Sequence, residues 1–243
     1  MMELILFATI GLCFGSFLNV VIVRLPKGQS VSLPASHCPT CKESLKWYHN
    51  IPLFSWLFLR GKCAFCKEPI SSMYPLVEVA TCSVFVLSYL KSDSIFQGAV
   101  LSLLFALLFA LSMIDFKYKA VPDALSFPAL GLSILTGDII LSVQNALIFA
   151  GGFALLRMIV SSITKKEAMG EADIIIAGVI GAVCGIKLGL FAIYLGALIT
   201  IPAFLIVRKK GFELPFIPFL SLGLFLTWAY ETEILKWVEN IYG

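Results

Sequence analysis

Residues 95–114 read IFQGAVLSLLFALLFALSMI and are followed directly by an aspartate, Asp115. This stretch carries no charged residue and is long enough to cross a bilayer as an upright helix, which takes roughly 20 residues. The whole 243-residue chain is 59% hydrophobic and only 14% charged, with a mean hydropathy of +0.95. A soluble domain of this length would carry about a quarter charged residues. The sequence therefore predicts an all-α polytopic membrane protein.

Working outward from this stretch, we find eight candidate transmembrane helices. They lie at about 4–23, 74–90, 95–114, 122–137, 140–161, 173–186, 188–207 and 215–235. The fourth and the sixth are short for a full crossing. A polar stretch between the first two spans is large enough to form a small extramembrane domain. We therefore divide the chain into a first transmembrane helix (1–23), a small domain (24–73) and a larger transmembrane domain (74–243).

The positions of the basic residues predict the topology, because cytoplasmic loops are enriched in Lys and Arg. The stretch 24–73 holds seven of the 18 basic residues, and the loops after the third, fifth and seventh spans hold seven more. We therefore expect these four loops in the cytoplasm and both termini outside. We expect the first span to remain as a membrane helix, because Met1-Met2-Glu3 lacks the basic start of a signal peptide.

Two aspartates fall on the cytoplasmic face in this topology. Asp115 ends the third span, and Asp173 begins the sixth and closes the motif Met169-Gly170-Glu171-Ala172-Asp173. A carboxylate at the edge of a hydrocarbon segment is costly and is a functional candidate by default. Two carboxylates close together in a low dielectric share one proton. The ionised partner can then activate a water molecule while the protonated one polarises a carbonyl group, as in aspartic proteases.

The small domain contains two Cys-x-x-Cys knuckles separated by 21 residues, Cys38-Pro39-Thr40-Cys41 and Cys63-Ala64-Phe65-Cys66. Four thiolates complete a tetrahedral set that suits zinc. Disulfides are the alternative interpretation, but a reducing cytoplasmic location disfavours them. We therefore predict a structural zinc site at Cys38, Cys41, Cys63 and Cys66, in a cytoplasmic zinc-binding domain.

The stretch between the knuckles, LKWYHNIPLFSWLFLR at residues 45–60, is too aromatic for a free loop, and Pro52 prevents a full span. Trp and Tyr favour the headgroup region of a membrane. The stretch could therefore lie on the membrane surface, or it could form the core of the small domain. The two interpretations are compatible, and both stay open.

Three further polar residues are weaker candidates for substrate contact or for support of the site. Asn19 shares a helical face with Gly11 and Gly15, whose small size lets a neighbouring helix approach, and packing is the preferred explanation. Glu78 lies inside the second span, where it either contacts substrate or is buried with a partner. Asp123 begins the fourth span, and we prefer a role as a helix N-cap.

Several of these segments resemble the type IV prepilin peptidase family of GxGD-type aspartic proteases. The similarity extends over nearly the whole chain. It rests on Gly15–Ile22 (GSFLNVVI), Arg24-Leu25-Pro26, the two knuckles, Asn50-Ile51-Pro52-Leu53, Ser55-Trp56-Leu57, Leu59–Cys63 (LRGKC), Tyr74–Glu78 (YPLVE), Ile114-Asp115, Pro122-Asp123 and the segment around Asp173.

The resemblance implies that Asp115 and Asp173 are the catalytic pair of a transmembrane aspartic peptidase domain, residues 74–243. It implies a bacterial inner-membrane endopeptidase that removes the short basic leader from type IV prepilins or type II secretion pseudopilins. It also implies N-methylation of the new N-terminus with S-adenosylmethionine. The expected partners are these substrates and membrane lipids, and no nucleic acid.

The sequence departs from the family pattern at four positions. Gly170 keeps the first glycine of Gly-x-Gly-Asp, but Ala172 replaces the second, and Ile175 replaces a lysine that usually follows. Met73 and Ile217 stand where an arginine and a glycine are usual. An alanine costs little unless the backbone needs a positive φ, so we expect cleavage to survive. Methylation is less strongly implied.

Two other functions stay open at this stage. Another intramembrane aspartyl protease, of the preflagellin or signal-peptide peptidase type, would share the aspartates, but the tetracysteine stretch and the N-terminal block speak against it. A proton-coupled transporter could use Asp115 and Asp173 as a relay. In that case both carboxylates should lie nearer mid-membrane, in a chain with an internal repeat, and we find no such repeat.

Overall fold

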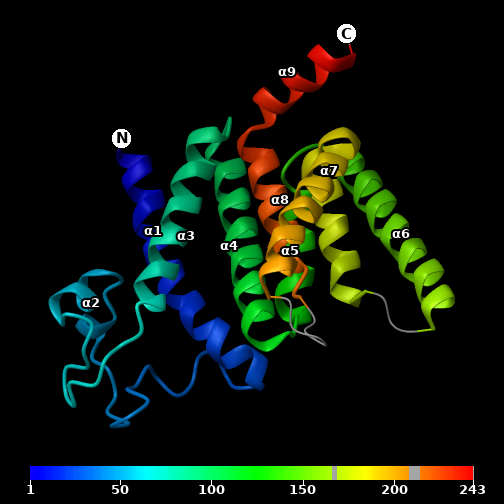
Figure 1. Cartoon of the computed structure of the whole chain (residues 1–243). Coiled ribbons are helices and arrows are strands. Elements are labelled where there is room, and N and C mark those ends of the chain that lie inside the picture. Colours follow the sequence, from blue (N-terminus) through cyan, green and yellow to red (C-terminus); the bar gives the residue numbers. More distant parts are fainter. Residues whose placement is uncertain (166–168, 208–213, 243) are drawn as a thin grey trace. The chain divides into compact units, whose positions relative to one another are not determined.

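The computed structural model describes residues 1–165, 169–207 and 214–242, and within them it contains helices and no β-strand (Figure 1). The helices are α1 (Met2–Arg24), α2 (Phe54–Phe58), α3 (Met73–Lys91), α4 (Ile95–Tyr118), α5 (Asp123–Ile134), α6 (Ile139–Thr164), α7 (Glu171–Val207), α8 (Ile217–Ala229) and α9 (Glu231–Tyr242). Among the described residues, α1, α3, α4, α6 and α7 are long and apolar enough to cross a membrane. The predicted all-α polytopic membrane fold is confirmed.

The helix α7 consists of two helices joined at Gly185, where φ is +67° and ψ is −169°. Only glycine adopts this conformation readily. Gly181 and Gly189, on either side of the break, both lie against the ring of Phe149. Figure 1 shows the chain reversing direction here, so the first and last turns of α7 lie toward the same end of its unit. The two halves correspond to the predicted spans 173–186 and 188–207.

The last predicted span, 215–235, ends too late. The apolar helix α8 stops at Ala229, Tyr230 leaves the helical conformation, and α9 follows from Glu231. The reason lies in composition, because α9 begins with two carboxylates, Glu231 and Glu233, and mixes polar with apolar residues. The shorter apolar helices are α5 and α8.

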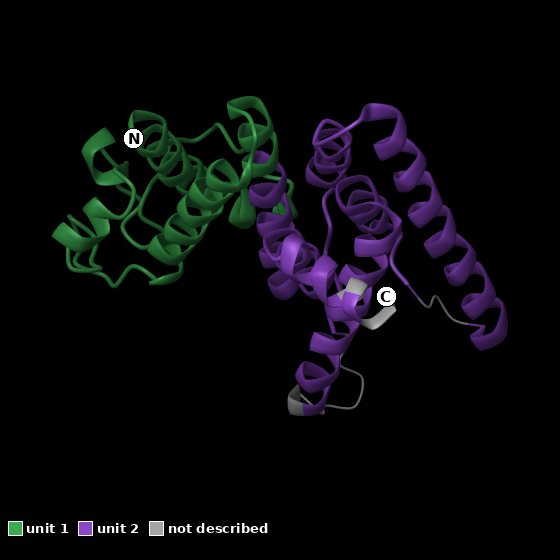
Figure 2. Cartoon of the chain, turned by 90° about the horizontal axis from the view of Figure 1, so that it is seen from above, with its two compact units in different colours: residues 1–102 green, residues 103–243 purple. Residues whose placement is uncertain are grey.

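The chain forms two compact units, residues 1–102 and 103–243, with the division inside α4 (Figure 2). In the first unit α1 packs against α3. A Cβ atom at Gly11 would lie 2.9 Å from the Cα of Cys82, and one at Gly15 would lie 2.7 Å from the Cα of Glu78. A side chain at either position would collide with α3, so only glycine fits there. This confirms that these residues let a neighbouring helix approach closely.

In the second unit α7 packs against α5, α6 and α8. Glycines again set the closest approaches. A Cβ atom at Gly223 of α8 would collide with the backbone oxygen of Ala192, and one at Gly196 would lie 2.9 Å from the backbone oxygen of Phe219. The second half of α7 and α8 are therefore in backbone contact, which fixes the position at which α8 begins.

Candidate catalytic site and metal centre

Asp115 lies in the last turn of α4 and is only 7% exposed. The backbone N–H of Ile217 donates a hydrogen bond to its carboxyl group. Ile217 is the first residue of α8, so the amino end of this helix is directed at Asp115. The positive end of a helix dipole favours a carboxylate there. Lys119, one turn further along the chain, adds a positive charge nearby.

Asp173 is the third residue of α7 and is 9% exposed. The backbone N–H of Gly170 donates a hydrogen bond of 3.1 Å to Oδ2 of Asp173. Gly170 directly precedes the helix, so the carboxylate satisfies an N–H that has no partner within the helix. The start of α7 is also held by an ion pair of 3.4 Å between Arg157 of α6 and Glu171.

The two buried carboxyl groups lie close enough for the charge of Asp115 to act on Asp173. Both belong to the second unit, and each lies near the end of an apolar helix. A buried pair of acids that interact through their charges can share one proton. The arrangement is therefore able to provide one general base and one general acid within one unit.

The departures from the family pattern fit this backbone. Ala172 lies within α7 and has no positive φ, so a side chain there adds no strain. Ile217 is helical and 1% exposed, and it contributes its backbone N–H, which any residue except proline could supply. Neither substitution disturbs the groups that contact the two aspartates.

Asp123 is exposed, unlike Asp115 and Asp173. It is the exposed first residue of α5, and Pro122 rather than Asp123 occupies the N-cap position, without a side-chain capping bond. The predicted cap is therefore misplaced by one residue. A carboxylate in the first turn still interacts favourably with the helix dipole.

The two cysteine knuckles have the same local structure. In each, the N–H of the first cysteine donates to the backbone oxygen of a glutamate five residues later, with Cys38 to Glu43 at 3.0 Å and Cys63 to Glu68 at 2.8 Å. The intervening lysine has a positive φ in both. The shared sequence Cys-x-x-Cys-Lys-Glu, which sequence reasoning overlooked, is the signal for this repeat.

The four sulfur atoms of Cys38, Cys41, Cys63 and Cys66 lie within 4.8 Å of one another, so they could hold a metal ion. None of the four forms a disulfide in this structure. The sulfurs of Cys38 and Cys66 are 3.8 Å apart. Zinc–sulfur bonds of about 2.3 Å in a tetrahedron place the sulfurs about 3.8 Å apart, so this pair has the spacing of a four-thiolate zinc site.

The backbone prepares one cysteine of each knuckle as a thiolate. The N–H groups of Cys41 and Thr40 lower the pKa of the Cys38 thiol to about 6. The N–H groups of Cys66 and Phe65 lower the pKa of Cys63 in the same way. The thiolate is the form that binds a metal ion, so the backbone favours that form at Cys38 and Cys63. Burial and the neighbouring thiols raise the pKa of Cys66 to about 11.

Asn19 and Glu78 are both buried between α1 and α3. The side chain of Asn19 donates a hydrogen bond of 3.1 Å to the backbone oxygen of Tyr74. The carboxylate of Glu78 accepts one of 2.7 Å from the N–H of Leu53 and another from the hydroxyl of Ser16. Both side chains have partners within the first unit, and neither belongs to the unit that contains the two aspartates.

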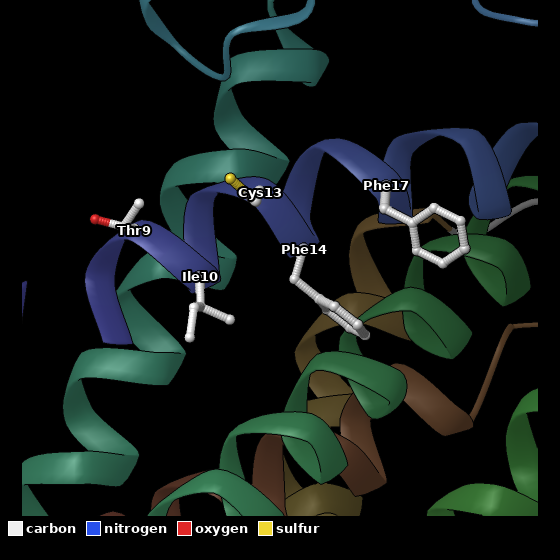
Figure 3. A pocket seen from close by; sticks show the side chains of 5 residues that line it. All are labelled: Thr9, Ile10, Cys13, Phe14 and Phe17. Carbon is white, nitrogen blue, oxygen red and sulfur yellow. The ribbon is translucent and has the colours of Figure 1, made fainter. Parts of the chain in front are cut away.

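Two shallow cavities lie on helix surfaces. One, of about 310 Å³, is lined by Thr9, Ile10, Cys13, Phe14 and Phe17 of α1 alone (Figure 3). Its lining contains no carboxylate and no basic side chain. The other, of about 390 Å³, lies between α6 and the start of α7 and is lined by Ala154, Arg157, Met158, Ser161 and Ile174. It adjoins the residue that follows Asp173.

The fold and the site together define a class: a polytopic helical membrane protein with a buried carboxylate pair and a separate four-thiol centre. Two family models match the chain. The bacterial peptidase A24 N-terminal domain matches residues 9–92, and the type IV leader peptidase family matches residues 102–205. No solved structure matches.

Several curated proteins are similar over most of their length. A prepilin leader peptidase/N-methyltransferase of Xanthomonas campestris is 34% identical, over 94% of this chain and 91% of that protein. A type 4 prepilin-like proteins leader peptide-processing enzyme of Escherichia coli is 34% identical, over 88% of each. A prepilin leader peptidase/N-methyltransferase of Vibrio cholerae is 35% identical, over 83% and 84%.

The chain therefore belongs to the type IV leader peptidase family, as its sequence motifs indicated. These relatives give no support to the transporter alternative.

Proposed function

We propose that this chain is an intramembrane aspartic endopeptidase that removes the short basic leader from type IV prepilins or type II secretion pseudopilins. The observation that carries the proposal is the buried pair of Asp115 and Asp173, whose charges interact. The names of the relatives support the substrate class.

In the proposed reaction, the ionised carboxylate of the pair takes a proton from a water molecule, and the water oxygen bonds to the scissile carbonyl carbon. The protonated carboxyl donates its proton to the carbonyl oxygen. Collapse of this intermediate breaks the carbon–nitrogen bond, and the leaving amine takes up a proton from the pair. The N–H groups of Gly170 and Ile217 orient the two carboxyls throughout.

The proposed topology places this chemistry at the cytoplasmic face of a bacterial inner membrane, with the N-terminus outside. The distribution of Lys and Arg supports it. A prepilin has a basic leader in the cytoplasm and an apolar helix in the bilayer, so its scissile bond lies at the inner interface. Water is available at that depth, and no helix backbone has to enter lipid unpaired.

We further propose zinc as the ion of the four-thiol centre, with a structural role. The matching sulfur spacing and the lowered pKa of Cys38 support it. N-methylation of the new N-terminus is proposed from the names of the relatives. S-adenosylmethionine would supply the methyl group when bound.

The experiment is mass spectrometry of a co-expressed prepilin from cells carrying the wild-type chain, Asp115→Asn or Asp173→Asn. The wild type should yield a pilin shortened by its leader, and each variant should leave it intact because the pair has lost its base or its acid. Asp123→Asn is the matched control and should process normally. Full processing by either variant of the pair would refute the aspartic mechanism. The same spectra report methyl addition.

A further inference from the structure

The short helix α2 exposes an unusual amount of apolar surface. Phe54 is 53% exposed, Leu57 is 55% exposed and Phe58 is 85% exposed. These three side chains, which we call the α2 face, follow a spacing of three and four residues and so lie on one side of the helix. The polar side chains of α2 are satisfied within the protein. Ser55 donates to the oxygen of Tyr48 at 2.7 Å, and Trp56 donates to that of Ile70 at 3.2 Å.

The start of α2 lies beside an apolar turn of α1. Leu53, which directly precedes α2, donates its N–H to Glu78, and Ser16 of α1 donates its hydroxyl to the same carboxylate. Leu53 is therefore level with Ser16, which lies eight residues before Arg24 at the end of α1. Eight residues of helix correspond to about 12 Å along the axis. The residues between them are apolar except for Asn19.

This position explains the buried carboxylate. Leu53 has a φ of +61°, so the chain turns sharply there. An N–H group without an acceptor is costly inside a membrane. Glu78 provides the acceptor from within an apolar helix, and Figure 1 shows α2 beside the first turns of α3.

We propose that α2 lies at the boundary between the lipid headgroups and the acyl chains, with the α2 face in contact with lipid and Glu78 as its tether. Interfacial helices bury an apolar face by about 5–10 Å in this boundary. Leu53 lies slightly further in, about 12 Å from Arg24 along the axis of α1. Lys46, Arg60 and Lys62 flank α2 and are exposed, so they can reach anionic headgroups. A soluble partner would have to enter the bilayer to reach the same surface.

The test uses the full chain in lipid nanodiscs, with the photo-crosslinking residue p-benzoyl-phenylalanine in place of Phe58. Irradiation should join this position to lipid, which mass spectrometry detects as an adduct of one lipid mass. The matched control carries the same residue in place of Glu43, an exposed position of the first knuckle, and should give no adduct above the unirradiated background. Absence of lipid adducts at position 58 would overturn the proposal. The same probe can also be irradiated in cells. Adducts there of pilin or another protein, instead of lipid, would overturn the proposal too.

The tether is tested in the same probe background. Glu78→Ala removes the acceptor of Leu53 and should lower the yield of lipid adduct at position 58. Glu78→Gln keeps an oxygen that can accept the same N–H and should restore most of the yield. An adduct yield in Glu78→Ala equal to that of the wild type would rule out the tether. Because the probe at position 58 of the wild type tests the lipid contact separately, a folding defect in Glu78→Ala leaves the main proposal testable.

Discussion

Asp115 and Asp173 each accept a hydrogen bond from one backbone N–H. One donor is near its aspartate in the sequence, and the other is far from it. The donor to Asp173 is Gly170, three residues earlier, and it could be anticipated from the pattern of a helix start. The donor to Asp115 is Ile217, in another helix far along the chain. Pro218, in the first turn of α8, signals that a helix begins there, but no sequence pattern reveals which carboxyl group that helix faces.

The hydrogen bond from Gly170 leads to a prediction. Gly170→Pro removes the N–H, and a hydrogen bond to a charged group contributes about 1.5–3 kcal/mol. We therefore expect the rate of leader cleavage to fall by about 10- to 100-fold. The measurement is the initial cleavage rate of a prepilin by the purified enzyme.

Gly170→Ala is the control for this prediction. It keeps the N–H, and its Cβ atom would lie 3.4 Å from Oδ2 of Asp173, an ordinary contact. It should retain most of the activity. Equal rates for the proline and alanine variants would show that this hydrogen bond does not hold Asp173 in its working position.

The helix α7 contains a break that depends on a single residue, Gly185. Both halves contact Phe149 of α6, and the break between them needs the backbone of Gly185. Sequence reasoning placed both halves correctly because the polar and small residues around Gly185 and Lys187 interrupt the apolar pattern. It placed the end of the last span wrongly because Ile234 and Leu235 continue the hydrophobic character past Tyr230, where the helix breaks.

Gly185→Ala should destabilise the second unit. A residue with a side chain at this φ and ψ costs of the order of 1–3 kcal/mol, and we expect a lower midpoint of thermal unfolding in detergent. Gly152→Ala in α6 is the matched control, because a Cβ atom there meets nothing within 4 Å. A midpoint for Gly185→Ala that equals the midpoint of this control would contradict the described break in α7.

At the scale of the molecule, the chain keeps the proposed metal site apart from the proposed catalytic pair. The four cysteines belong to the first unit and the two aspartates to the second. Sequence patterns predicted both sets of residues, because metal ligands and membrane carboxylates have strong local signals. The link from Glu78 to Leu53 escaped prediction, because it depends on how the stretch between the knuckles folds back on α3.

This separation predicts the effect of metal removal. Cys38→Ser and Cys63→Ser should lower the metal content and the yield of folded protein, because a structural zinc site contributes folding free energy. Metal analysis of the purified variants should show a lower metal content. Limited proteolysis should show cleavage within residues 25–72. Cys13→Ser, on the exposed surface of α1, is the control and should change neither. Full activity of a metal-free variant with serine at all four positions would disprove a structural role for the ion.

The sulfurs of the metal centre differ in their contact with water. Cys38 and Cys63 are buried, whereas Cys41 is partly exposed and Cys66 is exposed. An alkylating agent or a competing chelator that arrives from the aqueous side therefore meets one sulfur of each knuckle first. We expect demetallation to proceed stepwise from that side, with the ion still held by the inner sulfurs in the half-released intermediate.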